Sequence, residues 1–339
     1  MRIEAAAYRG RPVFWRLIAP WNSPGRMGRS SESFGESAGR LLFIVLLMTL
    51  VFGGAYFARR NLRLGRGDRR GAARLAYLVF TLWTVAWILR EHHVPDLVEA
   101  LIFLSSISWA LPVTAFLWLL YIALEPFVRR RWPASLVSWN RLFAGGFRDP
   151  LVGRDVLVGC ALAAVFVPLE YLSYELAPWI GVSADSPSSW TLSSLLGTRM
   201  ALSEIPRLVV WCIFWGLATL FLLFLFRVLL RRAWVAATLF VVILTAFSSI
   251  PSGSPITWVV AAFEWAIGYV LLTRFGLLAI TTSSAFANLF YRFPITPQLS
   301  AWYSGIGLAG VVLMLAFAGY AFHTAVAGQP LSGRAALED

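Results

Sequence analysis

The feature that most constrains this chain is a series of long apolar runs separated by short polar or arginine-rich segments. Runs of roughly 17–25 apolar residues match a helix that crosses a bilayer, where all backbone polar groups must pair internally. Nine such runs cover residues 41–58, 72–89, 98–124, 156–174, 208–226, 233–249, 256–273, 275–291 and 301–323. The eighth, rich in Ser, Thr and Ala, is either a span or a re-entrant segment. The sequence therefore predicts an all-α, polytopic membrane helix bundle over residues 39–324, with about nine transmembrane helices.

The composition agrees with a membrane location and excludes several kinds of enzyme. Hydrophobic residues make up 59% of the chain and charged residues only 14%, whereas soluble domains carry about 25% charged residues. All 29 basic residues are arginine. Without lysine the chain has no phosphate-binding P-loop Lys, no protein-kinase strand Lys and no Schiff-base amine. We expect no catalytic residue and no cofactor in this chain.

The distribution of arginine predicts how the bundle is oriented, because cytoplasmic loops carry the excess of basic residues. With the N-terminus outside, the inner segments hold 18 arginines and the outer loops after the first span hold four. The prediction is N-out and C-in, with residues 126–155 as a cytoplasmic loop and 325–339 as a cytoplasmic tail. The seven arginines of the N-terminal tail run against this orientation, since they would have to be translocated.

The N-terminal tail, residues 1–38, contains a β pattern. Residues 13–18 read as a strand, and Arg9-Gly10 before them reads as a turn. A single hairpin is marginally stable by itself. We therefore expect an extracytoplasmic tail that is the end of a larger domain continuing upstream.

The segment 126–148 is basic and amphipathic. Pro126 is expected to end the third span, and apolar residues then recur every three to four positions up to Phe147. This pattern predicts a helix on the inner membrane surface, acting either as a plain positive-inside anchor or as a binding site for anionic lipid or a partner. Asp149-Pro150 is expected to cap and open the fourth span. The candidate lipid-surface residues are Arg129, Arg130, Arg131, Trp139, Arg141 and Arg148.

Glu264 and Glu170 are the intramembrane acidic candidates. Charged residues within spans are costly and mark functional sites by default, although a protonated Glu can also hold helices together. Glu170 and Glu175 are expected to pair with Arg207 or Arg199, or with water.

Three smaller expectations concern side chains near the span ends. Glu125 should form a local salt bridge with the neighbouring arginines, and Trp109 should pack against an adjacent helix. His92 and Asp96 stand four residues apart, which suits a metal only on a helix. Because the chain has three histidines and two cysteines without metal-site spacing, we expect no metal site.

Several segments resemble the C-terminal membrane region of bacterial membrane-anchored serine/threonine protein kinases. They are residues 123–142, which contain Arg129-Arg130-Arg131-Trp132-Pro133, together with 147–155, 4–12, 60–71 and 328–334. The resemblance implies a protein integral to the bacterial cytoplasmic membrane, with a kinase domain preceding this region. None of that family's catalytic motifs is present here, since the chain has no Gly-rich loop with a Lys, no His-Arg-Asp and no Asp-Phe-Gly.

Two functions from different classes follow. The first is a non-catalytic membrane module that anchors, senses or signals, with the lipid bilayer, anionic headgroups, a kinase domain in cis or in trans, and a second copy of the chain as partners. The second is a small transporter or channel that uses Glu264 and Glu170. Transporters often show internal repeats, and none is evident here. Neither function involves nucleic acid.

Overall fold

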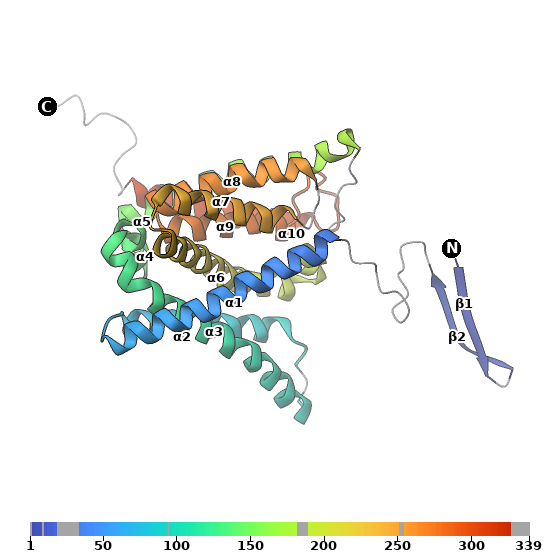
Figure 1. Cartoon of the computed structure of the whole chain (residues 1–339). Helices are drawn as coiled ribbons and strands as arrows, with labels where there is room; N and C mark the ends of the chain where they lie inside the picture. The colour runs from blue at the N-terminus through green and yellow to red at the C-terminus, as the bar shows by residue number, and fades with distance from the viewer. Residues whose placement is uncertain are drawn as a thin grey trace, which may run out of the picture.

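The structure of the protein is a computed structural model, and it describes residues 2–8, 10–18, 34–93, 95–181, 189–250 and 254–326 (Figure 1). The described residues form a β-hairpin, ten α-helices and two short 3-10 helices. The elements are β1 (Arg2–Tyr8), β2 (Arg11–Ile18), α1 (Phe34–Arg63), α2 (Arg69–Arg90), α3 (Leu97–Arg131), α4 (Ala134–Phe143), α5 (Pro150–Leu176), η1 (Ala177–Ile180), η2 (Ser189–Leu196), α6 (Thr198–Leu230), α7 (Ala233–Ser249), α8 (Pro255–Arg274), α9 (Leu277–Arg292) and α10 (Ser304–Ala325).

The chain is a multi-pass membrane protein. Seven of the nine apolar runs fall within a helix, while the runs 275–291 and 301–323 start two and three residues before α9 and α10. Seven described helices are long and apolar enough to cross a bilayer: α1, α2, α3, α5, α6, α8 and α10. The helix α7 is apolar but has 17 residues, and α9 has 16 residues with a more polar composition. The membrane-helix prediction is confirmed, whereas the count of nine spans and the orientation stay predictions.

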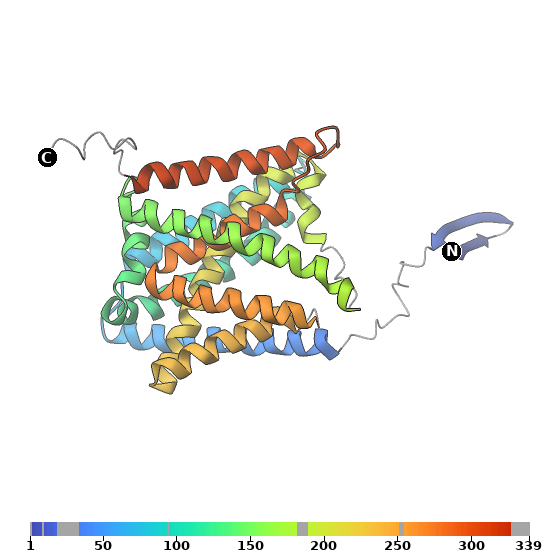
Figure 2. The same cartoon turned by 90° about the horizontal axis from the view of Figure 1, so that it is seen from above.

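The helix α6 forms the centre of the bundle. Of its most apolar stretch, 72% is buried inside the protein, against 17–39% for the other six long helices. Its fully buried Phe221 and Phe224 pack against Phe57 of α1. Seen from above, α5 lies between α9 and α10 on one side of the bundle (Figure 2). The apolar surface left exposed on the outer helices is the surface that lipid would cover.

The third span does not end at Pro126 as the sequence predicted, because α3 continues to Arg131. A proline within a helix leaves the carbonyl four residues earlier without its usual donor. Here that carbonyl belongs to Ile122, and the Asn61 side chain of α1 donates to it at 3.0 Å and to the Ala123 carbonyl at 3.1 Å. The freed backbone acceptor is thus satisfied by a neighbouring helix, so the α3 helix can pass through Pro126.

The short helix α4 exists as predicted, but its apolar face contacts protein. Leu136 and Trp139 are buried, packed in the core shared with α5 and α9. Gly276, at the start of α9, has a φ of +90° and lies so close to the Ser135 backbone that a Cβ would collide with it. Leu136 and Trp139 of the predicted amphipathic face therefore meet the bundle, whereas Phe147 is 58% exposed. Binding of this segment to lipid stays a prediction.

The two local features predicted around the turn and the cap are confirmed. The strand β2 pairs antiparallel with β1 around Gly10, whose φ of +73° is the left-handed conformation that glycine adopts readily. The helix α5 begins at Pro150, and the Asp149 carboxylate accepts a hydrogen bond from the Leu151 amide at 2.9 Å. Whether the hairpin belongs to a larger domain stays a prediction.

Candidate functional site

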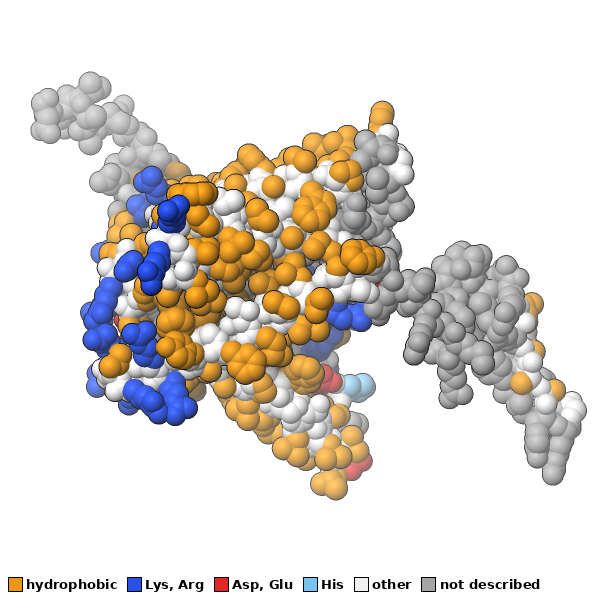
Figure 3. All heavy atoms as spheres, in the orientation of Figure 1, with side chains coloured by type: hydrophobic (Ala, Val, Ile, Leu, Met, Phe, Trp, Pro, Cys, Tyr) orange, Lys and Arg blue, Asp and Glu red, His pale blue; other side chains and the backbone are white. Residues whose placement is uncertain are grey.

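Basic side chains gather at one end of the bundle. Figure 3 shows them as a nearly continuous band over the end where α1, α3 and α6 finish and α4 lies. The segments that the arginine count assigned to one side of the membrane, 59–74, 126–155 and 227–232, meet there. The C-terminal end of α10 is also at this end, because Thr324 and Ala325 lie directly against Gly153 of α5. We call it the arginine end.

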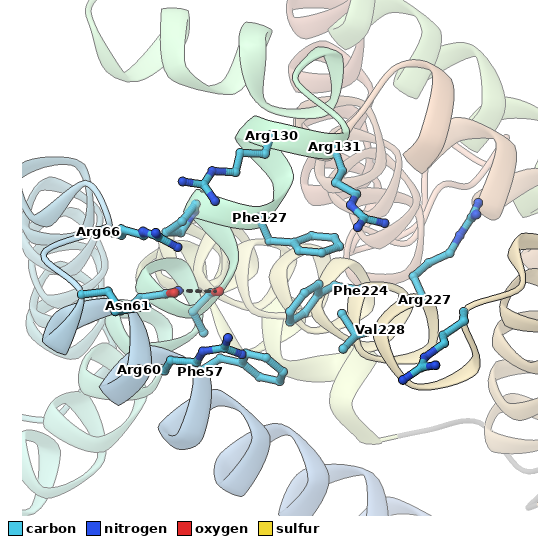
Figure 4. A pocket seen from close by; sticks show the side chains of 14 residues that line it. Phe57, Arg60, Asn61, Arg66, Phe127, Arg130, Arg131, Phe224, Arg227 and Val228 are labelled. Atoms are coloured by element: carbon cyan, nitrogen blue, oxygen red, sulfur yellow. Dashed lines mark hydrogen bonds between the residues drawn. The ribbon is translucent and has the colours of Figure 1, made fainter.

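A cavity of about 540 Å³ opens at the arginine end between α1, α3 and α6 (Figure 4). Its size falls within the range of small-molecule sites. Six arginines line the cavity, and none of the described lining residues is acidic. We call it the arginine pocket; its arginines are Arg60, Arg66, Arg130, Arg131, Arg227 and Arg231.

The floor of the arginine pocket is aromatic. Phe127 and Phe224 lie between the arginines in Figure 4, with their ring centroids 4.3 Å apart, and Phe57 contacts Phe224 at 4.9 Å. The Arg131 guanidinium lies 5.5 Å from the centroid of the Phe127 ring, within the range of a cation–π contact. The pocket therefore offers cationic walls above an apolar base.

Within the part of the chain that the structure describes, no acidic side chain neutralises the arginine pocket. Among the described residues, none of the six arginines forms an ion pair with an acidic side chain. The Arg227 guanidinium donates to Tyr269 Oη at 3.0 Å, while its Nε is buried without a hydrogen-bond partner. Guanidinium groups in such an arrangement match the oxygens of a phosphate or carboxylate. The pocket can hold an anion, and the buried Nε would gain an acceptor from it.

The predicted lipid-surface residues separate into different environments. Only Arg130 and Arg131 line the arginine pocket. Arg129 pairs with Glu125 at 3.5 Å, which confirms the predicted local salt bridge. The remaining three residues are not in the pocket: Arg141 pairs with Asp149 at 2.7 Å, Arg148 is exposed, and Trp139 is buried in the core.

The opposite end of the bundle holds a charge cluster that the sequence did not reveal. Glu204 of α6 is only 1% exposed and accepts from Arg90 of α2 at 3.0 Å, from Arg207 at 3.1 Å and from Arg292 of α9. We call these four residues the Glu204 cluster. It ties three helices together, and it shows that the expected pairing of Arg207 with Glu170 or Glu175 is wrong.

A partial signal for the Glu204 cluster was present in the sequence. Glu204 and Arg207 are three residues apart near the start of a span, which places them on one helix face. Arg90 and Arg292 sit at the ends of two other spans, on the side expected to be poor in arginine. Their convergence depends on how α2 and α9 pack on α6, which no local pattern gives.

The two predicted intramembrane acids lie on α5 and α8, which pack against each other. Glu170 of α5 accepts hydrogen bonds from Tyr291 of α9 and from Tyr174 at 3.4 Å. Glu264 lies on α8, and its buried Oε1 has no hydrogen-bond partner among the described residues. The two acidic side chains therefore belong to neighbouring helices of the bundle.

His93 is fixed in the loop between α2 and α3. Its Nδ1 lies 2.5 Å from Glu99 Oε1, and its Nε2 lies 2.9 Å from the Ile88 carbonyl. The hydrogen bond to Glu99 and then that to the carbonyl raise the pKa of His93 above 6.5. Within the described ranges, no group of three or more His, Cys, Asp and Glu side chains could hold a metal ion.

Comparisons with known proteins give no family or relative from which a function could be inferred. No protein-family model matches the chain, and neither a curated protein nor a solved structure gives a significant match.

Proposed function

We propose that this chain is a non-catalytic integral membrane module that binds a phosphate-bearing headgroup in the arginine pocket. The proposal rests on the convergence of six arginines, which have no acidic partner among the described residues, on one cavity with an aromatic floor. Each arginine near an anionic leaflet contributes roughly 1 kcal/mol of attraction. A phospholipid matches both parts of the pocket, because its phosphate can bind the guanidinium groups and its acyl carbons can pack on the phenylalanines.

At the inner face of the bacterial cytoplasmic membrane, the module would anchor a partner domain or signal to it that lipid is bound. This orientation is supported by the gathering of the 59–74, 126–155 and 227–232 segments at one end, where the anionic leaflet and the positive-inside bias coincide. The resemblance to kinase membrane regions supports a kinase domain, in cis or in trans, as the partner that receives the signal. A second copy of the chain is a further proposed partner.

The proposal is tested by lipid binding to the purified full chain, measured by native mass spectrometry with phosphatidylglycerol and phosphatidylcholine of matched acyl chains. The double variant Arg130→Gln/Arg131→Gln should weaken phosphatidylglycerol binding at least ~10-fold, because two charge-assisted hydrogen bonds are lost. The matched control is Arg69→Gln/Arg70→Gln, which removes two exposed arginines of the same end that do not line the pocket. Equal binding by the two variants would refute the site.

A soluble phosphate compound offers the same chemistry as a lipid headgroup, so a competition arm separates the two sources. Pyrophosphate is added to the chain loaded with phosphatidylglycerol. We expect the lipid to stay bound at millimolar pyrophosphate, since the aromatic floor contacts only the lipid. Displacement at micromolar pyrophosphate would identify a soluble ligand of the arginine pocket instead.

The position of Glu170 and Glu264 on two packed helices favours a second function, the passage of protons or small cations. Acidic residues within membrane-spanning helices often mark ion pathways in transporters. In proteoliposomes with an internal pH dye, Glu264→Gln would then slow acidification driven by an imposed gradient, while the exposed Glu175→Gln would not. Equal rates in protein-free vesicles and in all variants would remove this second function.

A further inference from the structure

A second cavity lies at the end of the bundle opposite the arginine pocket. It measures about 450 Å³ and opens between α2 and the first half of α3. Figure 1 shows the first half of α3 diverging from the other helices, and the cavity is lined by residues of this half-helix and of α2 and by Arg207 of α6. We call it the tryptophan cleft, after three of its lining residues, Trp83, Trp87 and Trp109.

The wall contributed by α3 faces lipid. Trp109 is 67% exposed, so the expectation that it packs against an adjacent helix is wrong. Leu101 and Leu104 on the same half-helix are similarly exposed. The lining from α3 also includes the polar Ser105 and Ser106. The apolar part of the cleft, around the three tryptophans, is where acyl carbons would pack, because an empty apolar void forfeits its contacts.

The polar end of the tryptophan cleft carries excess positive charge. Arg90 and Arg207 both line it, and both already bind Glu204, which also binds Arg292. One carboxylate therefore faces three guanidinium groups, and partly buried charge without a counter-ion is costly. Because Arg90 is 32% exposed and Arg207 is 21% exposed, both can reach an anion in the cleft.

The cleft also holds one acidic residue among its described lining residues, Glu91, which opposes an anionic ligand. The Arg199 guanidinium lies beside Glu91 and donates to its backbone carbonyl at 2.8 Å. The local balance therefore stays positive. The Trp87 indole nitrogen is buried without a hydrogen-bond acceptor, and a headgroup oxygen would supply one.

We propose that the tryptophan cleft binds one anionic phospholipid, with its phosphate against Arg90 and Arg207 and the start of an acyl chain between Trp83 and Trp109. This site belongs to the leaflet opposite the arginine pocket and is independent of it. The Glu204 cluster then has two roles, since it joins α2, α6 and α9 and it presents two of its arginines to the headgroup.

The test measures lipid binding by native mass spectrometry in the Arg130→Gln/Arg131→Gln background, in which binding at the arginine pocket is weakened. Trp109→Ala should weaken phosphatidylglycerol binding about fivefold, the effect of losing one interface side chain. The matched control is Trp234→Ala on α7, because Trp234 is also 67% exposed but does not line the cleft. Equal losses in the two variants would overturn the proposal.

The charged half of the site is tested with Arg90→Gln. This variant leaves Arg207 and Arg292 on Glu204, and an unchanged melting temperature would show that the bundle is intact. We expect phosphatidylglycerol binding to fall about tenfold and phosphatidylcholine binding to stay as it was. Equal affinity of the parent for the two lipids, or full displacement by soluble glycerol phosphate, would contradict an anionic-lipid site. If Arg90→Gln instead lowers the melting temperature, the Trp109→Ala result decides alone.

Discussion

The two ends of the bundle use the same residue type in opposite ways. At the arginine end, six arginines line one cavity without an acidic partner among the described residues, so their charge remains available to a ligand. At the other end, three arginines converge on the buried Glu204, so most of their charge holds helices together. The number of arginines at one end therefore does not show how much positive charge is available to a ligand, because this depends on the acidic side chains that pair with them.

The largest loss of stability should come from removing Glu204, the acidic residue that holds the three arginines of the second end together. Glu204→Gln leaves Arg90, Arg207 and Arg292 facing one another in a buried site, and breaking a buried ion pair from one side costs about 3–5 kcal/mol. We expect a large fall in melting temperature in detergent, measured by tryptophan fluorescence. The control Glu175→Gln removes an exposed carboxylate and should change little. A Glu204→Gln melting temperature equal to that of the control would show that the cluster does not join the helices.

At the arginine end, stability should depend on a neutral side chain instead of a charge. Asn61→Ala removes the donor to the Ile122 and Ala123 carbonyls and should cost about 1–3 kcal/mol, since the Ile122 carbonyl, which Pro126 cannot serve, is left unpaired. In a Pro126→Ala background the restored amide can bond to Ile122, so Asn61→Ala should cost less. A double-mutant cycle of melting temperatures measures this coupling. Additive losses would mean that Asn61 does not compensate for Pro126.

The smallest effect concerns His93, which lies in a loop at the Glu204 end. Because the pKa of His93 is raised by Glu99, the protonated ring is favoured in the folded protein. The pair should contribute its full stability below pH 6.5 and lose it as the pH rises through the raised pKa. NMR titration of the His93 ring measures the shift. Glu99→Gln should lower the pKa of His93, and an unchanged titration in that variant would remove Glu99 as the cause.

Local patterns in the sequence predicted much of the fold, because each of those features depends on neighbouring residues. The apolar runs became helices, Asp149-Pro150 opens α5, and Gly10 forms the hairpin turn. Pro126 was misjudged because the residue that compensates for it, Asn61, lies on another helix. The missing amide of Pro126 can be inferred from the sequence, but the donor that replaces it lies on another helix and cannot.

The candidate site was harder to predict for a related reason. An amphipathic helix has the same pattern whether its apolar face meets lipid or protein, and in α4 that face, with Trp139, meets protein. Arg130 and Arg131 were identified as candidates, but the other arginines of the pocket come from α1, α6 and the segments that follow them. Glu204 was missed because two of its three partners are on other helices.

The central claim is that the two ends face opposite sides of the membrane, with the arginine pocket in the cytoplasm. Single cysteines replace exposed residues at each end, Arg70→Cys at the arginine end and Gln298→Cys between α9 and α10 at the other. The native Cys160 and Cys212 are buried and stay in place, and the parent chain serves as the unlabelled control. With a membrane-impermeant maleimide on intact cells, we predict labelling at position 298, and labelling at position 70 only after permeabilisation. Labelling at position 70 in intact cells would contradict the account.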